Sequence, residues 1–410
     1  MNKKIFSEKL IVFLIFVFIL AGCTKKKNTV GIPNENIQPQ EIVLNSTFIE
    51  DCFSFEDSCR NYNENTNLIF GSFHGTQTYS LLRFANFPDS VVSFSGNANL
   101  KLYLKDKVNS ENIALQMGKI EENWLEDKAT WFTATDSTDW TSPGDFFSEI
   151  IPEEWNITED TLSISFSCEL IEDWINSDST NFGLVLFSSA DSSFLEINSS
   201  ETDKAPLLTF DYFTVQEDTM KTYSAAPVSD TFIFSSDNDY AKFENRIIIS
   251  DIQPIKTFIK FNISDSVFMN YENSGIENND DFRRMTINRA ELIFHKTEED
   301  FYLSGDELIL RPYPVLSENP DIPFVYGEDY EYLMGSSSDS LNTDEFVVDV
   351  TAIVQKITSG DYENHGFLLK SIFENKDYSY VEFASKNYQE EALRPFLRII
   401  YTPPFLDERE

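Results

Sequence analysis

The chain repeats one order of short apolar segments, and this repetition constrains its fold more than any other feature. The matched pairs include 46–49 with 230–233, 80–84 with 257–261, 98–103 with 290–295, 181–186 with 364–369 and 206–210 with 395–399. Most of them alternate apolar and polar residues, which is typical of strands that bury one face. We therefore expect two copies of one β-rich fold.

Composition favours the same class, because 37 Phe and 17 Tyr suit pleated, half-buried surfaces. Helical spacing in 170–175 and 353–357 predicts one short helix in each copy. The predicted fold is all-β, with two tandem antiparallel β-sandwich domains of jelly-roll type. We expect the domains at 41–214 and 229–403, a linker at 215–228 and a tail at 404–410.

The first 22 residues predict a secretory signal. A basic head is followed by the apolar run 10–20 and then by Leu-Ala-Gly-Cys, ending at Cys23. This ending resembles the bacterial lipobox, which implies that Cys23 carries a lipid and becomes the mature N-terminus. An uncleaved N-terminal anchor is the alternative. Thr24 in place of Asp favours the outer membrane or cell surface, and the polar segment 23–40 is expected to be a flexible spacer.

The charge balance argues against a nucleic-acid partner. The formal net charge is −38, and no basic stripe is present to neutralise phosphates. Such a surface should keep the protein soluble.

Three cysteines follow Cys23. An exported chain can pair Cys52 with Cys59 across a short loop, which would leave Cys168 as a buried free thiol in an alternating strand. No group of Cys and His has the spacing of a zinc site.

The layout resembles the DNRLRE domain family, also called disaggregatase-related domains. The motifs that carry the resemblance are Leu82-Arg83-Phe84, the stretch 122–131 (ENWLEDKATW), Val348-Asp349-Val350-Thr351 with the segment after it, and the Asn-x-Gly turn before each closing strand pair. The second repeat departs from the family pattern, because it lacks the tryptophan stretch. The resemblance implies non-catalytic β-sandwiches on cell-surface proteins, some of which bind acidic polysaccharides such as alginate.

Catalytic motifs do not emerge from the sequence. It contains no Gly-x-Ser-x-Gly elbow, no His-Glu-x-x-His and no phosphate-binding glycine loop. His74 and His365 lie in polar turns, where surface histidines are more common than catalytic bases. A pair of carboxylates is no evidence for glycoside hydrolysis in so acidic a chain, because such pairs occur throughout it.

Glycan binding has several candidate residues. Trp140 and Trp155 lie in polar segments, where an exposed indole can stack on a sugar ring, although tryptophan often fills a core instead. The basic candidates are Arg83, Lys101, Lys105, Lys260, Arg283, Arg284 and Arg289. Lys101 and Lys105 alternate along one strand and should share a face, yet ordinary solvated charges explain such residues equally simply.

Ca²⁺ is a further candidate ligand. Oxygen ligands for it are offered by Asp237, Asp239, Asp280 and Asp281, although no run of residues matches a calcium-binding loop.

The leading hypothesis is a non-catalytic, lipid-anchored surface protein that binds extracellular polysaccharide. A structural or adhesive protein without a glycan site is the second hypothesis, and a polysaccharide-degrading enzyme is the third.

Overall fold

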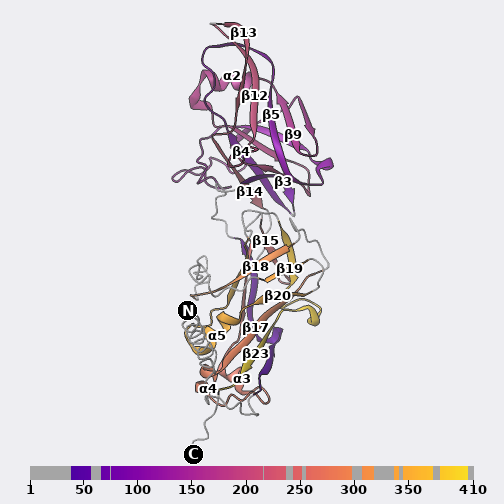
Figure 1. Cartoon of the computed structure of the whole chain (residues 1–410), viewed down its shortest axis with the longest axis vertical. Coiled ribbons are helices and arrows are strands. Elements are labelled where there is room, and N and C mark those ends of the chain that lie inside the picture. Colours follow the sequence, from indigo (N-terminus) through magenta and orange to yellow (C-terminus); the bar gives the residue numbers. More distant parts are fainter. Residues whose placement is uncertain are drawn as a thin grey trace, which may run out of the picture.

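The computed structural model describes residues 38–56, 66–73, 75–215, 217–236, 243–251, 255–297, 307–317, 337–340, 345–372 and 379–404. The predicted signal, Cys23 and nearly all of the predicted spacer lie outside these residues. Figure 1 shows an elongated molecule with two lobes along its longest axis. We call the described residues within 66–236 the first lobe, and the described residues within 38–56 and 243–404 the second lobe.

The first lobe is built on one antiparallel sheet that curls into a half-barrel. Its main path runs β13-β12-β5-β11-β3-β4-β10-β6-β7, with β9, β8 and β14 paired at the sides. The bounds are β3 Asn67–Phe73, β4 Thr76–Arg83, β5 Val91–Val108, β6 Leu115–Ile120, β7 Phe147–Ile150, β8 Glu154–Ile157, β9 Thr161–Phe166, α2 Glu169–Asn176, β10 Leu184–Ser188, β11 Ser193–Asn198, β12 Leu207–Thr214, β13 Glu217–Ala225 and β14 Ser229–Ser236.

The second lobe contains the other two antiparallel sheets of the described chain, ordered β1-β23-β17-β20 and β19-β18-β21-β16-β15-β22, with β2 paired to β16. The bounds are β1 Gln40–Leu44, β2 Ile49–Glu56, β15 Arg246–Ser250, β16 Ile255–Phe261, α3 Asp265–Met269, α4 Asn279–Arg284, β17 Thr286–His295, β18 Glu307–Pro314, β19 Ser337–Ser340, β20 Glu345–Asp349, α5 Thr351–Ser359, β21 Phe367–Ser371, β22 Tyr380–Ala384 and β23 Phe396–Thr402.

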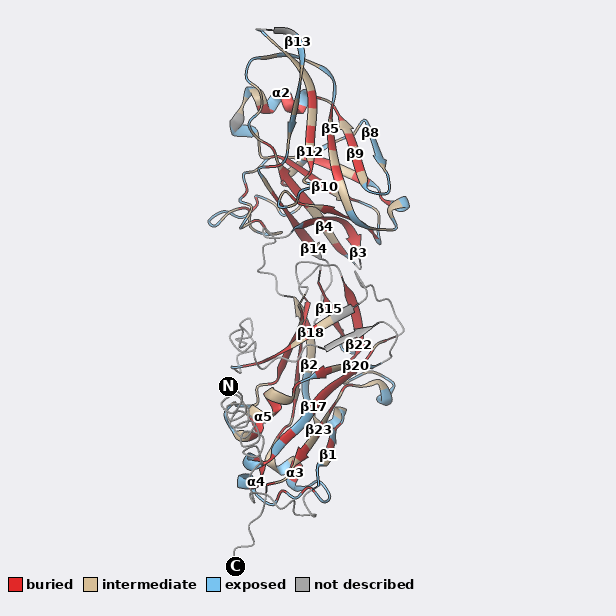
Figure 2. Cartoon of the chain, in the orientation of Figure 1, coloured by how far each residue is buried: buried red, intermediate tan, exposed pale blue. Residues whose placement is uncertain are grey.

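Alternating sequence explains the strands. In β9 and β23 every second residue is buried, as the period of two requires. The buried faces meet in one large cluster in each lobe, and Figure 2 shows the buried residues following the strands of both lobes. Each fully buried Leu or Phe contributes about 1.5–3 kcal/mol by leaving water.

Both predicted short helices are present. Leu170, Ile171 and Trp174 form the buried stripe of α2, and Ile353, Val354 and Ile357 form that of α5. The second lobe also holds α3 and α4, which were not predicted from the sequence because helices of five and six residues are too short to show a helical repeat.

Three strands pair across the predicted domain limits. β2, inside the predicted first domain, pairs with β16 of the second lobe, while β14, inside the predicted second domain, pairs with β4 of the first lobe. β1 likewise pairs with β23 of the second lobe. The predicted linker 215–228 instead contains β13, which pairs with β12 of the first lobe. The strand pairing therefore inserts the first lobe into the second, and the chain crosses between the lobes twice.

Candidate functional site

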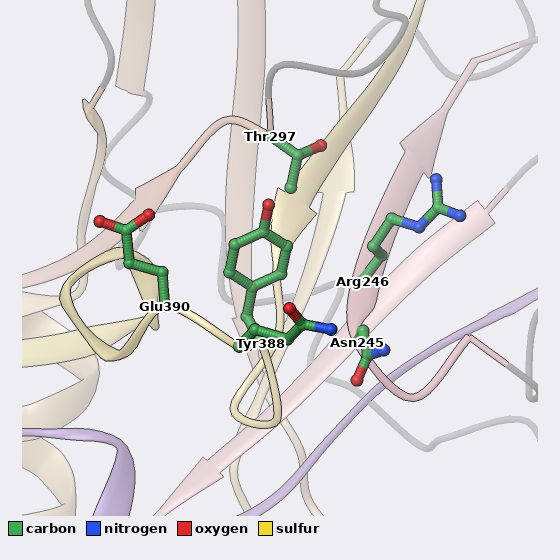
Figure 3. A pocket seen from close by; sticks show the side chains of 6 residues that line it. Asn245, Arg246, Thr297, Tyr388 and Glu390 are labelled. Atoms are coloured by element: carbon green, nitrogen blue, oxygen red, sulfur yellow. The ribbon is translucent and has the colours of Figure 1, made fainter.

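A polar pocket of about 370 Å³ opens on the second lobe. It is lined by Asn245, Arg246, Thr297, Tyr388, Gln389 and Glu390. Arg246 begins β15, Thr297 follows β17, and 388–390 form part of the turn between β22 and β23. Figure 3 shows the Tyr388 ring standing among the polar side chains. The six residues come from three distant segments, which the antiparallel pairing brings together.

One wall of the pocket is held by a buried carboxylate. Arg246 Nη1 lies 2.6 Å from Glu382 Oε2, and the Tyr380 hydroxyl donates to Glu382 Oε1 over 2.7 Å. The Thr297 amide donates to the backbone oxygen of Glu382 at 3.2 Å. The Glu382 side chain is only 7% exposed, so the pair with Arg246 is shielded from solvent on one side.

The opposite wall is a fixed turn. The Tyr388 amide donates to the Ser385 carbonyl at 3.2 Å, and Arg394 Nε donates to the Tyr388 carbonyl at 2.7 Å. The Tyr388 side chain is half-buried, while Gln389 and Glu390 are exposed. A half-buried ring on a held turn is pre-organised to contact a ligand.

The chemistry of the pocket lining suits a hydroxyl-rich molecule. Amide, hydroxyl, guanidinium and carboxylate groups supply both donors and acceptors, and Tyr388 adds an aromatic surface. The charge of Arg246 is already compensated by Glu382, and Glu390 contributes a further negative charge. The lining therefore provides no net positive field for an anion.

The two tryptophan candidates differ in exposure. Trp140 is only 3% exposed, donates through Nε1 to the Thr130 carbonyl at 2.8 Å and stacks on Phe146 at 4.4 Å. The prediction of Trp140 as a stacking platform is therefore corrected: its flanking segment is polar, but its indole fills the core. Trp155 on β8 is 39% exposed and keeps an accessible ring.

The basic candidates of the first lobe are already engaged. Arg83 donates to the Trp124 carbonyl at 2.8 Å and lies over the Trp124 ring. Lys101 and Lys105 both lie on β5, but Lys101 Nζ sits 4.9 Å from the centroid of the Tyr103 ring, whereas Lys105 pairs with Glu196 at 2.8 Å. These three residues do not form a free cationic patch.

The basic candidates of the second lobe are dispersed. Lys260 on β16 pairs with Glu50 at 3.1 Å. Arg289 on β17 pairs with Glu291, which also pairs with Arg398. Arg283 and Arg284 are exposed at the end of α4. None of the predicted basic residues lines the polar pocket.

The structure describes only some of the remaining candidate residues. Asp281 accepts hydrogen bonds from Asn278 Nδ2 at 2.9 Å and from the Glu277 amide at 3.2 Å, so its carboxylate is used inside the α4 turn, next to the exposed Asp280. Asp237, Asp239 and His74 lie outside the described residues. Cys59 does too, and Cys52 has a free thiol, so the predicted disulfide stays a prediction.

The polar pocket was not predicted from the sequence. Its six residues are common surface types, and the turn at 388–390 reads only as a polar loop. The only local signal for the pocket was a polar turn after a buried strand, and a local signal does not show which distant residues lie opposite that turn.

None of the described helices is long and apolar enough to cross a membrane.

Comparisons with known proteins add little. No family model matches the chain, and no curated protein matches it significantly. One solved structure, described as manganese lipoxygenase of Gaeumannomyces graminis with a partial structure of zonadhesin of Komagataella pastoris, is 12% identical. The alignment covers 88% of this chain and 85% of that chain with a TM-score of 0.13, a value too low to support a common fold.

Proposed function

We propose that this chain is a lipid-anchored, non-catalytic surface protein that binds extracellular polysaccharide through the polar pocket. The observation that carries the proposal is the pocket lining, in which the Tyr388 ring stands beside five hydrogen-bonding side chains. Sites for sugars combine these two features, because a sugar ring has an apolar face and a rim of hydroxyl groups. The basic head, apolar run and Cys23 support the anchor.

For the fold we propose two jelly-roll-like β-sandwiches of DNRLRE type. Matching contacts in the two lobes support a duplicated unit. Asn181 Nδ2 donates to the Phe84 carbonyl and Asn364 Nδ2 donates to the Phe261 carbonyl, each at 2.7 Å. The glycine two residues after each Asn has a positive φ, +94° at Gly183 and +98° at Gly366.

The pocket chemistry favours binding over hydrolysis. Glycoside hydrolysis needs two carboxyl groups that face the scissile bond with different protonation states. Here Glu382 is held by Arg246 and Tyr380, and Glu390 is the only carboxylate among the six lining residues. A ligand in this pocket would meet one free acid.

Affinity electrophoresis tests the proposal. The full-length chain in detergent is run through native gels that contain alginate or a neutral β-glucan, with a gel without polysaccharide as the reference. Retardation in a polysaccharide gel supports binding. Equal mobility across a broad polysaccharide panel would favour the structural or adhesive role, and release of new reducing ends would favour the enzyme.

A further inference from the structure

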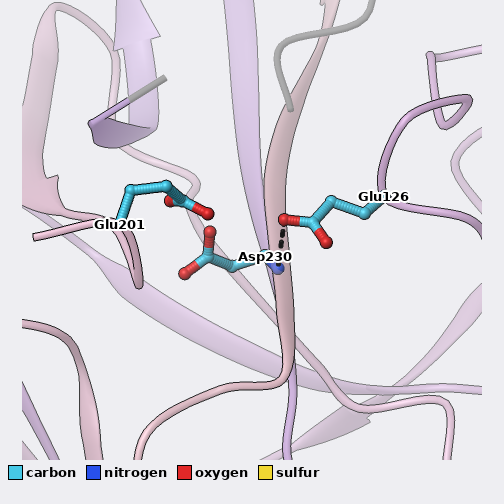
Figure 4. Close-up of side chains that lie close together, drawn as sticks. All are labelled: Glu126, Glu201 and Asp230. Atoms are coloured by element: carbon cyan, nitrogen blue, oxygen red, sulfur yellow. Dashed lines mark hydrogen bonds between the residues drawn. The ribbon is translucent and has the colours of Figure 1, made fainter. Parts of the chain in front are cut away.

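Three carboxylates converge in the first lobe, whereas the polar pocket lies on the second. We call Glu126, Glu201 and Asp230 the acidic trio; one oxygen from each lies within 4.8 Å of the others. Glu126 belongs to the long loop after β6, Glu201 to the turn after β11, and Asp230 to β14. Figure 4 shows the Asp230 carboxyl group pointing toward that of Glu201, with Glu126 on the other side of the strand.

Acidic clusters on a surface are common, but Asp230 is not on the surface. It is 1% exposed, and its Oδ1 has no hydrogen-bond partner. Its Oδ2 accepts from the Ser200 amide at 2.7 Å, which fixes the carboxyl group in place. A buried oxygen without a partner is costly, and a bound cation is a standard way to satisfy it.

The surroundings add to this cost. Burial first, and then the charges of Glu201 and Glu126, raise the pKa of Asp230 to about 7. Burial also raises the pKa of Glu126, again with a contribution from Glu201. The nearby Arg83 donates to the Trp124 carbonyl at 2.8 Å and to Asn123 at 3.4 Å. Arg83 Nη2 is thus engaged by the loop that carries Glu126, while Arg83 Nε has no hydrogen-bond partner among the described residues and the guanidinium charge attracts the Glu126 carboxylate.

From this geometry we propose that the acidic trio is a Ca²⁺ site. All three ligands are carboxylate oxygens, which suit a hard cation, whereas zinc prefers nitrogen and sulfur ligands. Ca²⁺ takes 6–8 oxygens, and Glu201 is exposed, so water completes the shell from the solvent side.

Such an ion would join three segments that are remote in sequence. It would hold the start of β14 against the loop of Glu126 and the turn of Glu201. β14 is the last strand of the first lobe before the chain returns to the second lobe. The ion would therefore fasten the start of the strand that precedes the second chain crossing, and not the crossing itself.

Calorimetry tests the site directly. The full-length chain in detergent is freed of divalent ions with a chelator and titrated with CaCl₂. We expect a saturable site that Glu201→Gln weakens by at least about tenfold, because a charged ligand is lost. Glu201 is exposed, so this variant should fold normally. Asp203→Asn removes one negative charge from the same turn outside the trio and should bind as the wild type does.

Two further results decide the proposal. Ca²⁺ should raise the unfolding temperature of the wild type and of Asp203→Asn, and raise it less in Glu201→Gln and Asp230→Asn. Absence of saturable Ca²⁺ binding overturns the proposal. So does binding that Glu201→Gln leaves unchanged, or that Asp203→Asn weakens equally, since either would mean general attraction to an acidic surface. Tighter binding of Mg²⁺ would reject calcium as the ion.

Discussion

The Phe73 ring of the first lobe packs edge-on against the Tyr380 ring of the second, with centroids 6.4 Å apart and an interplanar angle of 87°. Tyr380 also donates its hydroxyl to Glu382, the carboxylate that holds Arg246 at the polar pocket. One residue therefore connects the contact between the lobes with the wall of the pocket.

Tyr380→Phe tests that connection. The ring and its contact with Phe73 remain, but Glu382 loses a buried hydrogen bond worth about 1.5–3 kcal/mol, because the acceptor is charged. We expect a lower midpoint in urea denaturation and weaker polysaccharide retardation. Tyr271→Phe is the control, since Tyr271 is 42% exposed and lies away from the pocket lining. Equal midpoints for both variants would contradict this role of Tyr380.

The two Asn side chains that precede the Gly turns should matter equally. Asn181→Ala and Asn364→Ala each remove one hydrogen bond to a backbone carbonyl, at a cost of about 1 kcal/mol. Urea denaturation should show similar losses for the two variants. Asn112→Ala, at an exposed position, should change stability little. A loss in only one lobe would argue against duplicated turns.

Gly183 should tolerate no side chain. Its φ is +94°, and a Cβ would lie 2.2 Å from the Leu82 carbonyl oxygen. Gly183→Ala should cost about 3 kcal/mol or more, because the backbone of β4 cannot yield easily.

Gly96→Ala is the matched control for that substitution. Gly96 has a φ of +79° with nothing within 4 Å of a built Cβ. Only backbone strain remains there, at about 1 kcal/mol. Thermal unfolding measures the loss of stability in both variants, and we expect the larger loss in Gly183→Ala. A larger loss in Gly96→Ala would refute this prediction.

The fold class was accessible from the sequence, because alternating strands and helical spacing are local signals. The helices at 169–176 and 351–359 follow from buried residues three and four apart. The pairing of strands is not a local signal. β2 pairs with β16, but its sequence does not distinguish β16 from β4 as a partner, since both offer a compatible apolar face. The predicted limits at 41–214 and 229–403 therefore missed the exchanged pairing.

Site residues were harder to predict for the same reason. Trp140 lies among Thr, Asp and Ser, yet the loop folds over its ring. Arg246 and Tyr388 are 142 positions apart in the chain and meet only because β15 pairs with β22. The Lys101–Lys105 spacing did place both lysines on β5, but their partners Tyr103 and Glu196 decide their availability.

Cys168 should be chemically inert in the folded chain. Burial raises the pKa of its thiol to about 11, and Sγ donates to the Gly96 carbonyl at 3.5 Å. At pH 8 only about one thousandth of such a thiol is thiolate, the reactive form. Alkylation followed by peptide mass spectrometry should show Cys168 reacting at least about 100-fold slower in the native chain than in urea. Similar rates in both states would contradict its burial.

Polysaccharide binding at the polar pocket is the central claim, and Tyr388→Ala tests it most directly. The half-buried Tyr388 ring is the aromatic surface of the pocket, whereas Tyr271 is an exposed ring outside the lining. In affinity gels containing the polysaccharide that retards the wild type, Tyr388→Ala should lose most of its retardation, because the variant removes the aromatic surface of the pocket lining, and stacking between aromatic rings, taken as a guide, is worth about 0.5–1.5 kcal/mol. Tyr271→Ala should migrate like the wild type. Undiminished retardation of Tyr388→Ala would contradict the assignment of the pocket.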